Sequence, residues 1–330
     1  MSLNFILPRP GAPIQSRSPV HGPSEEAFVE TFGALLPAAK YLTTGSGKAA
    51  YYEFESPEPG SAKPMLHTPN RVLFIHGVQT PAFGLLPLVR ALEPSFPHAQ
   101  FLLVDLWGHG LSNTPTLPHD PSLFLGLIDD LLDHLQWPSA HLVGYSFGGS
   151  LAARYVASRP SKVQSFTLIA PAGLIPSNVF SAEEKSHLAG GGDEAAAQKW
   201  VFAWLGGDSE VVPVDWKERV GRGQVVSEAV KAWQKREHPG HVASVLAIIR
   251  DGGVVDGSAV FLKAAQTSIP SLVVLGALDD ICTTEELAEL GFAKVFVVPE
   301  VGHGVVRERG PEVAGFISDF WSGLDPVSGG

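Results

Sequence analysis

Six short runs of apolar residues, separated by amphipathic stretches, restrict the fold of this chain most strongly. The runs are rich in Val, Leu, Ile and Phe, and they cover residues 72–75, 100–104, 140–143, 163–169, 272–275 and 294–298. Continuous apolar runs of this length are typical of strands buried on both faces, as in a parallel sheet. Residues 40–44 and 49–55, on either side of a Gly-rich turn, predict two further short strands.

Apolar residues recur at helical spacing between several of these runs. Such patterns cover residues 84–92, 123–135, 150–159 and 306–321. Strands that alternate with helices through short connections predict a doubly wound α/β sheet. Right-handed crossovers would place the C-terminal ends of its parallel strands along one edge, and sheets of this kind form their sites there.

The alternation stops between the fourth and the fifth run. Residues 176–267 show no pattern that predicts a strand, whereas helices are expected over residues 195–205, 225–238 and 242–250. Four of the seven tryptophans fall in this stretch, which favours a helical lid over the sheet edge rather than ordinary flanking helices. We therefore predict a cap over residues 176–267, a core of residues 38–175 and 268–330, and a Pro-rich, irregular surface leader over residues 1–37.

Composition argues against several kinds of partner. The 330 residues are 45% hydrophobic, which suffices for a large buried core. The net charge is -11 and the basic residues are scattered, so we expect no nucleic-acid partner. No window of about 18 apolar residues predicts a membrane span. Because the N-terminus does not resemble a signal peptide and Cys282 is the single cysteine, we expect a cytoplasmic protein. The oligomeric state stays open, a homo-oligomer included.

The strongest chemical signal is the segment GYSFG at residues 144–148. It directly follows an expected strand and precedes an expected helix, which is the setting of a nucleophile elbow. In such a turn the serine adopts strained backbone angles, and glycines two residues before and after it avoid collisions with neighbouring chains. The turn would present Ser146 Oγ at a helix N-terminus, where negative charge is stabilised. The alternative is a merely structural Gly-rich turn, and the strand and helix around it favour the nucleophile.

A serine hydroxyl needs a base, and that base needs an acid to fix its tautomer. Among 12 histidines, His303 is our candidate for the base, since it follows the last expected strand at the same sheet edge as Ser146. Asp279 and Asp280 both follow the fifth run. We favour Asp279 and keep Asp280 as the alternative acid, because one of the two can instead cap the next helix.

Acyl transfer also needs hydrogen-bond donors for the oxyanion. The backbone N–H groups of Phe147 and Val78 are our candidates, with Gly77 letting its loop turn toward the substrate. Tyr145 and Trp107 are further candidates for substrate contact. The loop at residues 105–112 is given a structural role, and His76 is expected to anchor the neighbouring loop by hydrogen bonds.

As a set, these features resemble the α/β-hydrolase superfamily over roughly residues 70–320. The matching motifs occur in the family's order, at residues 76–77, 105–112, 144–149, 279 and 302–303. The resemblance implies an eight-stranded, mostly parallel sheet flanked by helices, a helical cap inserted between strands 6 and 7, and no cofactor or metal. Serine at position 146 argues against dehalogenases and epoxide hydrolases, which are similar in layout but have aspartate there.

Carboxylesterases, lactonases and carbon–carbon bond hydrolases remain as the families that the chain resembles. We expect a serine hydrolase that cleaves an uncharged, fairly apolar ester or lactone through an acyl-enzyme. Hydrolysis of a β-diketone would use the same three side chains, so the sequence does not separate the two reactions. The alternative from another class is a non-catalytic small-molecule receptor. A receptor of this kind would be expected to lack the serine or the histidine. Both residues are present.

Overall fold

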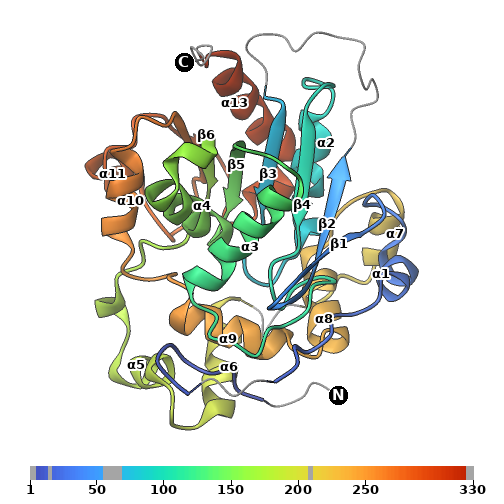
Figure 1. The fold of residues 1–330 in the computed structure, drawn as a ribbon, viewed down its shortest axis with the longest axis vertical. Coiled ribbons are helices and arrows are strands. Elements are labelled where there is room, and N and C mark those ends of the chain that lie inside the picture. Colours follow the sequence, from blue (N-terminus) through green and yellow to red (C-terminus); the bar gives the residue numbers. More distant parts are fainter. Residues whose placement is uncertain (1–4, 14–16, 55–68, 207–210, 325–330) are drawn as a thin grey trace.

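The computed structural model describes residues 5–13, 17–54, 69–206 and 211–324, and an eight-stranded sheet forms its centre (Figure 1). The strand order is β1-β2-β4-β3-β5-β6-β7-β8. Strand β2 pairs antiparallel with both β1 and β4, and all neighbouring pairs from β4 to β8 are parallel. The strands are β1 (Lys40–Thr44), β2 (Gly47–Phe54), β3 (Arg71–Ile75), β4 (Gln100–Val104), β5 (Ala140–Tyr145), β6 (Val163–Ile169), β7 (Ser271–Gly276) and β8 (Val295–Val298). The predicted α/β-hydrolase sheet is confirmed.

Both faces of the central strands are buried, which explains why they appear in the sequence as uninterrupted apolar runs. In β3, Leu73 and Ile75 pack into the core on one face, while Val72 and Phe74 pack into the core on the other. Strand β8 lies at the sheet edge and differs, because its Phe296 is 41% exposed. The side chains of the central strands are therefore buried under helices on both faces of the sheet.

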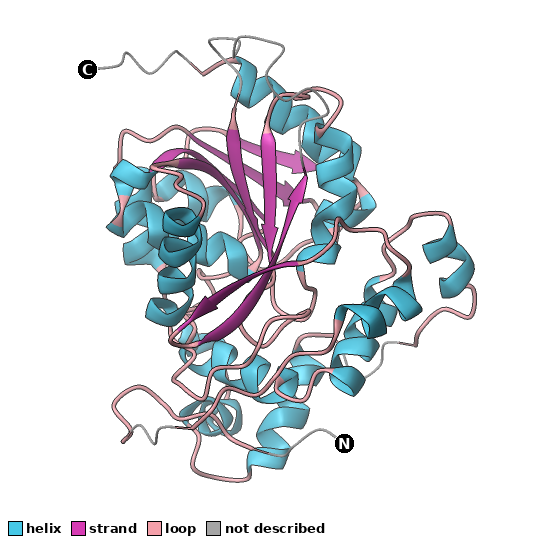
Figure 2. Cartoon of the chain, turned by 45° about the vertical axis from the view of Figure 1, so that its right-hand side comes forward, coloured by secondary structure: helices cyan, strands magenta, loops and turns pink. Residues whose placement is uncertain are grey.

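Helices cover the two faces of the sheet (Figure 2). One face packs against α2 (Leu86–Leu92) and α13 (Gly310–Ser322). The other packs against α3 (Pro121–His134), α4 (Phe147–Ser158) and α10 (Ser258–Ala265). Short helices α11 (Thr284–Glu289) and α12 (Val305–Glu308) lie near the last strands.

Two predicted helices are divided in the structure. The 3₁₀ turn η1 (Ala82–Leu85) precedes α2, so the pattern over residues 84–92 contains both. The expected helix over residues 306–321 is divided into α12 and α13. Pro311 lies in the first turn of α13, where a residue without an N–H is tolerated. In the interior of a continuous helix, the same proline would remove a hydrogen bond, so α12 ends before it.

Helices without any strand fill the described part of the chain between β6 and β7. They are η3 (Ser177–Val179), α5 (Ala182–Ala189), α6 (Glu194–Trp204), α7 (Trp216–Gly221), α8 (Ser227–Glu237), α9 (His241–Asp251) and α10. The predicted helices correspond to α6, α8 and α9, which lie with α5 below the sheet in Figure 1. Helix α10 instead packs against α4 on the sheet's flank, so the segment over the sheet edge ends before Ser258.

The leader is not irregular throughout, contrary to our expectation. It contains α1 (Glu25–Phe32), which begins at the N-cap Ser24. Phe28 and Phe32 are buried against Phe83 and Trp233, so the helix belongs to the core. The prolines before residue 24 obscured a short signal, an N-cap serine followed by two glutamates and an i, i+4 aromatic pair.

The leader's first described segment crosses the helical insertion. Leu7 packs against Ala243 and Ala247 of α9, and Arg9 pairs with Asp251 at the end of that helix. Arg9 also donates to the main-chain oxygen of Leu188 in α5 at 2.9 Å. The leader thus links α5 and α9. Within the described ranges, no helix has the length and apolar character needed to span a bilayer.

Candidate active site

Ser146 lies in the tight turn between β5 and α4, with φ 55° and ψ −118°. Two glycines make this turn possible. A Cβ on Gly144 would lie 2.3 Å from the main-chain oxygen of Gly148, and one on Gly148 would lie 2.0 Å from that of Ile75. No side chain fits at either position, so the glycine spacing in the motif is a steric requirement of the turn.

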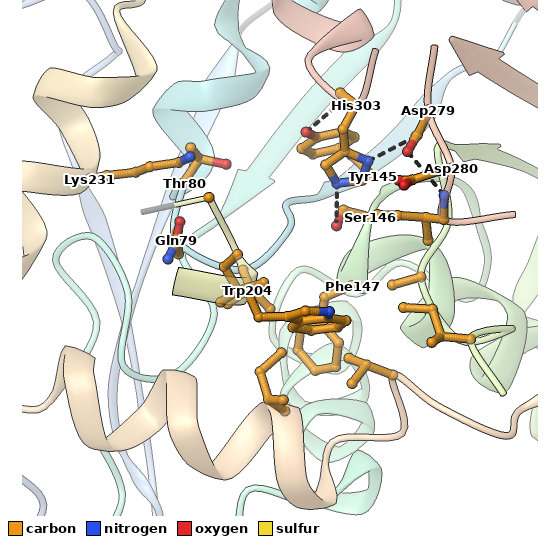
Figure 3. A pocket seen from close by; sticks show the side chains of 18 of the residues that line it. Gln79, Thr80, Tyr145, Ser146, Phe147, Trp204, Lys231, Asp279, Asp280 and His303 are labelled. Carbon is orange, nitrogen blue, oxygen red and sulfur yellow. Dashed lines mark hydrogen bonds and ion pairs between the residues drawn. The ribbon is translucent and has the colours of Figure 1, made fainter. Parts of the chain in front are cut away.

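The structure brings Ser146 and His303 together from distant parts of the chain (Figure 3). His303 Nε2 lies 2.9 Å from Ser146 Oγ, and His303 Nδ1 lies 2.9 Å from Asp279 Oδ2. A neutral imidazole that donates from Nδ1 to the carboxylate can accept the hydroxyl proton at Nε2. The three side chains therefore form a hydrogen-bonded series from carboxylate to imidazole to hydroxyl.

The two candidate acids occupy different places. Asp279, after β7, has a side chain only 4% exposed, and its other oxygen accepts from the N–H of Ile281. Asp280 lines the adjacent cavity but forms no hydrogen bond with the imidazole of His303. A buried carboxylate with two fixed donors holds the histidine ring in one orientation.

Tyr145 contacts the histidine as well as the cavity. Its Oη donates to the main-chain oxygen of His303 at 2.9 Å, and the two rings lie 5.2 Å apart between centroids. Arg307 Nη1 donates in turn to Tyr145 Oη at 3.4 Å. Burial raises the pKa of Tyr145, which keeps the phenol protonated as a donor. This contact to His303 was absent from our sequence-based expectations.

The two candidate oxyanion donors lie on the cavity wall. Phe147 is the first residue of α4, where backbone N–H groups have no partner four residues earlier. Val78 lines the cavity from the loop after β3. Gly77 lies beside the serine, since a Cβ on it would approach Ser146 Cβ to 2.7 Å. Glycine at this position thus allows the loop to pass next to Ser146.

Trp107 does not line the cavity, and our expectation of substrate contact is wrong for this residue. It is 1% exposed and packs in the core between the sheet and the helices. Its main-chain oxygen accepts from Ser244 Oγ of α9 at 3.1 Å. The sequence placed Trp107 near the sheet edge correctly, but the direction of a side chain in a loop depends on contacts far along the chain.

The loop at residues 105–112 is held by buried hydrogen bonds, as expected. The carboxylate of Asp105 accepts from Tyr52 Oη and from the N–H groups of Ala82 and Leu111. Burial nevertheless raises the pKa of Asp105 to about 6. His76 accepts from the N–H of Leu106 at 2.9 Å, and burial lowers its pKa to about 4, so it stays neutral. His76 therefore anchors the loop and is not available as a base.

A cavity of about 610 Å³ opens beside Ser146, between the sheet edge and the helical insertion. Its lining from the insertion and the residues before it is largely apolar and includes Ile175, Val179, Trp204, Leu205, Ile249 and Val254. Polar residues that we had not singled out also line it, namely Gln79, Thr80, Lys231 and Arg307. Their positions carried a weak signal, since Gln79 and Thr80 follow Val78 and Arg307 lies one turn beyond His303. No group of three or more His, Cys, Asp or Glu gathers as metal ligands would within the described chain.

The sheet order, the tight turn at Ser146 and the helical insertion are together those of the α/β-hydrolase fold. A family model described as alpha/beta hydrolase fold matches residues 70–204. The chain therefore has the α/β-hydrolase fold, and its residues 70–204 match this family.

Curated relatives are similar over part of their length. The chain is 29% identical to the dihydrolipoyllysine-residue acetyltransferase component of an acetoin cleaving system from Pseudomonas putida, over 64% of this chain and 53% of that protein. It is 28% identical to a serine hydrolase-like protein from Danio rerio, over 44% of this chain and 46% of that protein. The chain therefore spans about half the length of these two relatives.

Solved structures share the fold at lower sequence identity. An enol-lactonase from Burkholderia xenovorans superposes with a TM-score of 0.62 at 20% identity, over 85% of this chain and 99% of the other. Identity at this level shows a common architecture only.

Proposed function

We propose that this protein is a serine hydrolase that cleaves a carboxylic ester or lactone, with Ser146, His303 and Asp279 as its catalytic triad. The observation that carries the proposal is the pair of 2.9 Å hydrogen bonds that join the hydroxyl, the imidazole and the carboxylate. The match to the α/β-hydrolase family model and the similarity to the serine hydrolase-like protein of Danio rerio support a hydrolase.

The reaction proceeds in two halves. His303 Nε2 takes the proton from Ser146 Oγ as the oxygen attacks the carbonyl carbon, and a tetrahedral oxyanion forms. The N–H groups of Phe147 and Val78 stabilise this oxyanion, aided by the N-terminal end of α4. His303 then protonates the leaving alkoxide and afterwards activates a water molecule that releases the acyl group from Ser146.

The helical insertion acts as a cap over the site. Its apolar side chains, such as Trp204 and Ile249, favour a substrate with a substantial apolar part and exclude water from the reacting atoms. Hydrolysis of a carbon–carbon bond in a β-diketone would use the same triad. Product analysis on paired ester and diketone substrates distinguishes these reactions.

Labelling with a fluorophosphonate probe tests the proposal directly. The wild-type protein is expected to label at Ser146, and Ser146→Ala is expected not to label while retaining its circular-dichroism spectrum. Ser150→Ala serves as a matched control. Ser150 lies in α4, where its hydroxyl donates to the main-chain oxygen of Gly253, and this variant should still label. A folded wild-type protein that does not label would favour the non-catalytic receptor instead.

A further inference from the structure

One part of the cavity wall holds hydrogen-bond donors that the proposed mechanism does not use. These donors are the side chains of Gln79, Thr80, Lys231 and Arg307. In Figure 3, Lys231 and Thr80 lie on one side of Ser146, and Asp279 and Asp280 lie on the other. The cavity therefore has an acidic side and a side rich in donors, next to an apolar lining.

Arg307 is the central group of this wall. Its guanidinium lies over the ring of Tyr145, 5.4 Å from the centroid, and its one hydrogen bond within the described chain is the 3.4 Å contact to Tyr145 Oη. It forms no ion pair with a described residue, not even with the adjacent Glu308. By contrast, Arg309 pairs with Glu312 at 2.6 Å. A half-buried guanidinium without a carboxylate partner is well suited to bind an anionic ligand.

Thr80 lies close to this guanidinium, and Lys231 extends toward Thr80. Thr80 Oγ1 and Arg307 Nη1 lie 3.3 and 3.9 Å from the point where a Cβ on Gly84 would be, so the two groups are neighbours. Lys231 extends from α8 toward Thr80 in Figure 3. Lys231 lines the same wall and has a further interaction of its own.

Gln79 supplies a donor whose partner is missing from the described chain. Its side chain is buried, and Nε2 has no hydrogen-bond partner there. The backbone at Gln79 is held with φ 70°, because its main-chain oxygen accepts from Gln234 of the cap and its N–H donates to His109 at 3.4 Å. A buried donor without an acceptor is destabilising, but this nitrogen has no surface toward the cavity, so it offers no hydrogen bond to a ligand there.

We infer that the substrate carries a carboxylate, which Arg307 binds with help from the neighbouring Thr80. This inference rests on the proposed function and specifies its substrate as a half-ester of a dicarboxylic acid or a lactone with a carboxylate side chain. An apolar segment of the substrate would lie against Trp204 and Ile249. The inferred substrate differs from the uncharged one that the sequence led us to expect, because Arg307 and Thr80 come together only in the folded chain.

The test compares 4-nitrophenyl half-esters of glutarate, adipate and pimelate with neutral 4-nitrophenyl esters of the same chain length, corrected for spontaneous hydrolysis. We expect the wild-type protein to prefer at least one half-ester, with a higher kcat/KM. Arg307→Met should lower the ratio of half-ester to neutral-ester kcat/KM by about tenfold to a hundredfold, since it removes a charge-assisted contact. Arg307→Lys should restore part of the ratio, and added salt should lower it in the wild type.

Arg309→Met is the matched control, because Arg309 lies two residues away but pairs with Glu312 outside the cavity. It should leave the ratio unchanged. The inference is overturned if neutral esters are hydrolysed while the half-esters show no preference, or if Arg307→Met leaves the ratio as it is in the wild type.

Binding measurements separate this inference from the proposed function. In a Ser146→Ala background, calorimetry with the monoanilide of adipate and with hexananilide tests the subsite without any turnover. Tighter binding of the anionic anilide, lost on adding Arg307→Met, supports the inference even if no ester is cleaved. Equal binding of the two anilides contradicts it, whatever the esterase assay shows.

Discussion

The phenol oxygen of Tyr145 donates a 2.9 Å hydrogen bond to the main-chain oxygen of His303. Tyr145 directly precedes Ser146 and ends β5, so one strand end positions both Ser146 and the loop of His303. The ring of Tyr145 also contacts the imidazole of His303. In the proposed mechanism, Tyr145 is thus a positioning residue for the proposed triad rather than a group that reacts.

Tyr145→Phe should lower kcat by about fivefold to tenfold, because the loop of His303 loses one anchor, while KM for a small neutral ester changes little. Stability should fall by about 1 kcal/mol, as expected for one buried hydrogen bond. Steady-state kinetics and urea unfolding measure the two effects. Tyr52→Phe is the control, since it removes a buried bond to Asp105 and should affect stability alone. An unchanged kcat in Tyr145→Phe would contradict this role.

Asp279→Asn should reduce kcat by about 10³- to 10⁴-fold, because an amide at this position no longer fixes the tautomer of His303 or stabilises the imidazolium. Asp280→Asn should change kcat by no more than a few fold, since Asp280 does not contact the imidazole. Pre-steady-state acylation rates with 4-nitrophenyl esters measure both variants. If the two losses were reversed, Asp280 would be the catalytic acid.

Gly148→Ala should destabilise the fold by at least about 2 kcal/mol or prevent folding, because its Cβ would overlap the main-chain oxygen of Ile75. Gly315→Ala is the matched control. Gly315 lies within helix α13 with open space around its Cα, so alanine there should stabilise by about 0.5–1 kcal/mol. Thermal unfolding of both variants checks the pair. A stable Gly148→Ala protein would show that the turn can relax.

Trp204→Ala should raise KM about tenfold for an octanoate ester and much less for an acetate ester, because the indole lines the apolar side of the cavity. Trp216→Phe is the control, since Trp216 packs against Phe32 away from the cavity. Kinetics across a series of chain lengths measures the effect. An equal change for short and long esters would argue against substrate contact at Trp204.

Stability should fall as the pH drops below 6.5, because buried histidines are neutral in the folded protein. Burial lowers the pKa of His76 and His238 to about 4 and that of His241 to about 3, and it lowers the pKa of His109 as well. The unfolded chain binds these protons near pH 6.5 and the folded chain does not. For each such histidine, acidification lowers the free energy of unfolding by up to about 1.4 kcal/mol per pH unit, until the pH reaches the pKa of that histidine in the folded protein.

Asp105 acts with the opposite sign in part of this range. Its pKa is raised to about 6, so between its ordinary value and pH 6 the folded state binds the extra proton. One aspartate does not offset several histidines, and the net change on acidification remains a loss. Urea unfolding at a series of pH values measures the slope. In His241→Asn the amide can still donate to the main-chain oxygen of Gly108. This variant should lower the slope of the free energy of unfolding against pH by the equivalent of about one bound proton, and an unchanged slope would contradict a neutral, buried His241.

Much of the fold follows from local patterns in the chain. Strands such as β4 and β6 coincide with the predicted apolar runs, because a strand buried on both faces requires consecutive apolar residues. The nucleophile turn was equally local, since the glycines around Ser146 meet a steric demand within a few residues. Helix α5 was missed because it has no buried residue, although the capping box of Ser181 and Glu184 was visible in the sequence.

The amino-acid sequence alone determined the order of the elements, the sheet edge at which Ser146, His303 and Asp279 would meet, and the steric character of the turn. The tertiary structure was needed to choose between Asp279 and Asp280 as the partner of His303, to bury Trp107, and to bring Arg307 to Thr80. The physical reason is how far apart in the chain the interacting residues are. Hydrophobic periodicity and turn geometry are properties of neighbouring residues, whereas the direction of a loop side chain depends on atoms from distant segments that only the folded chain brings within contact distance.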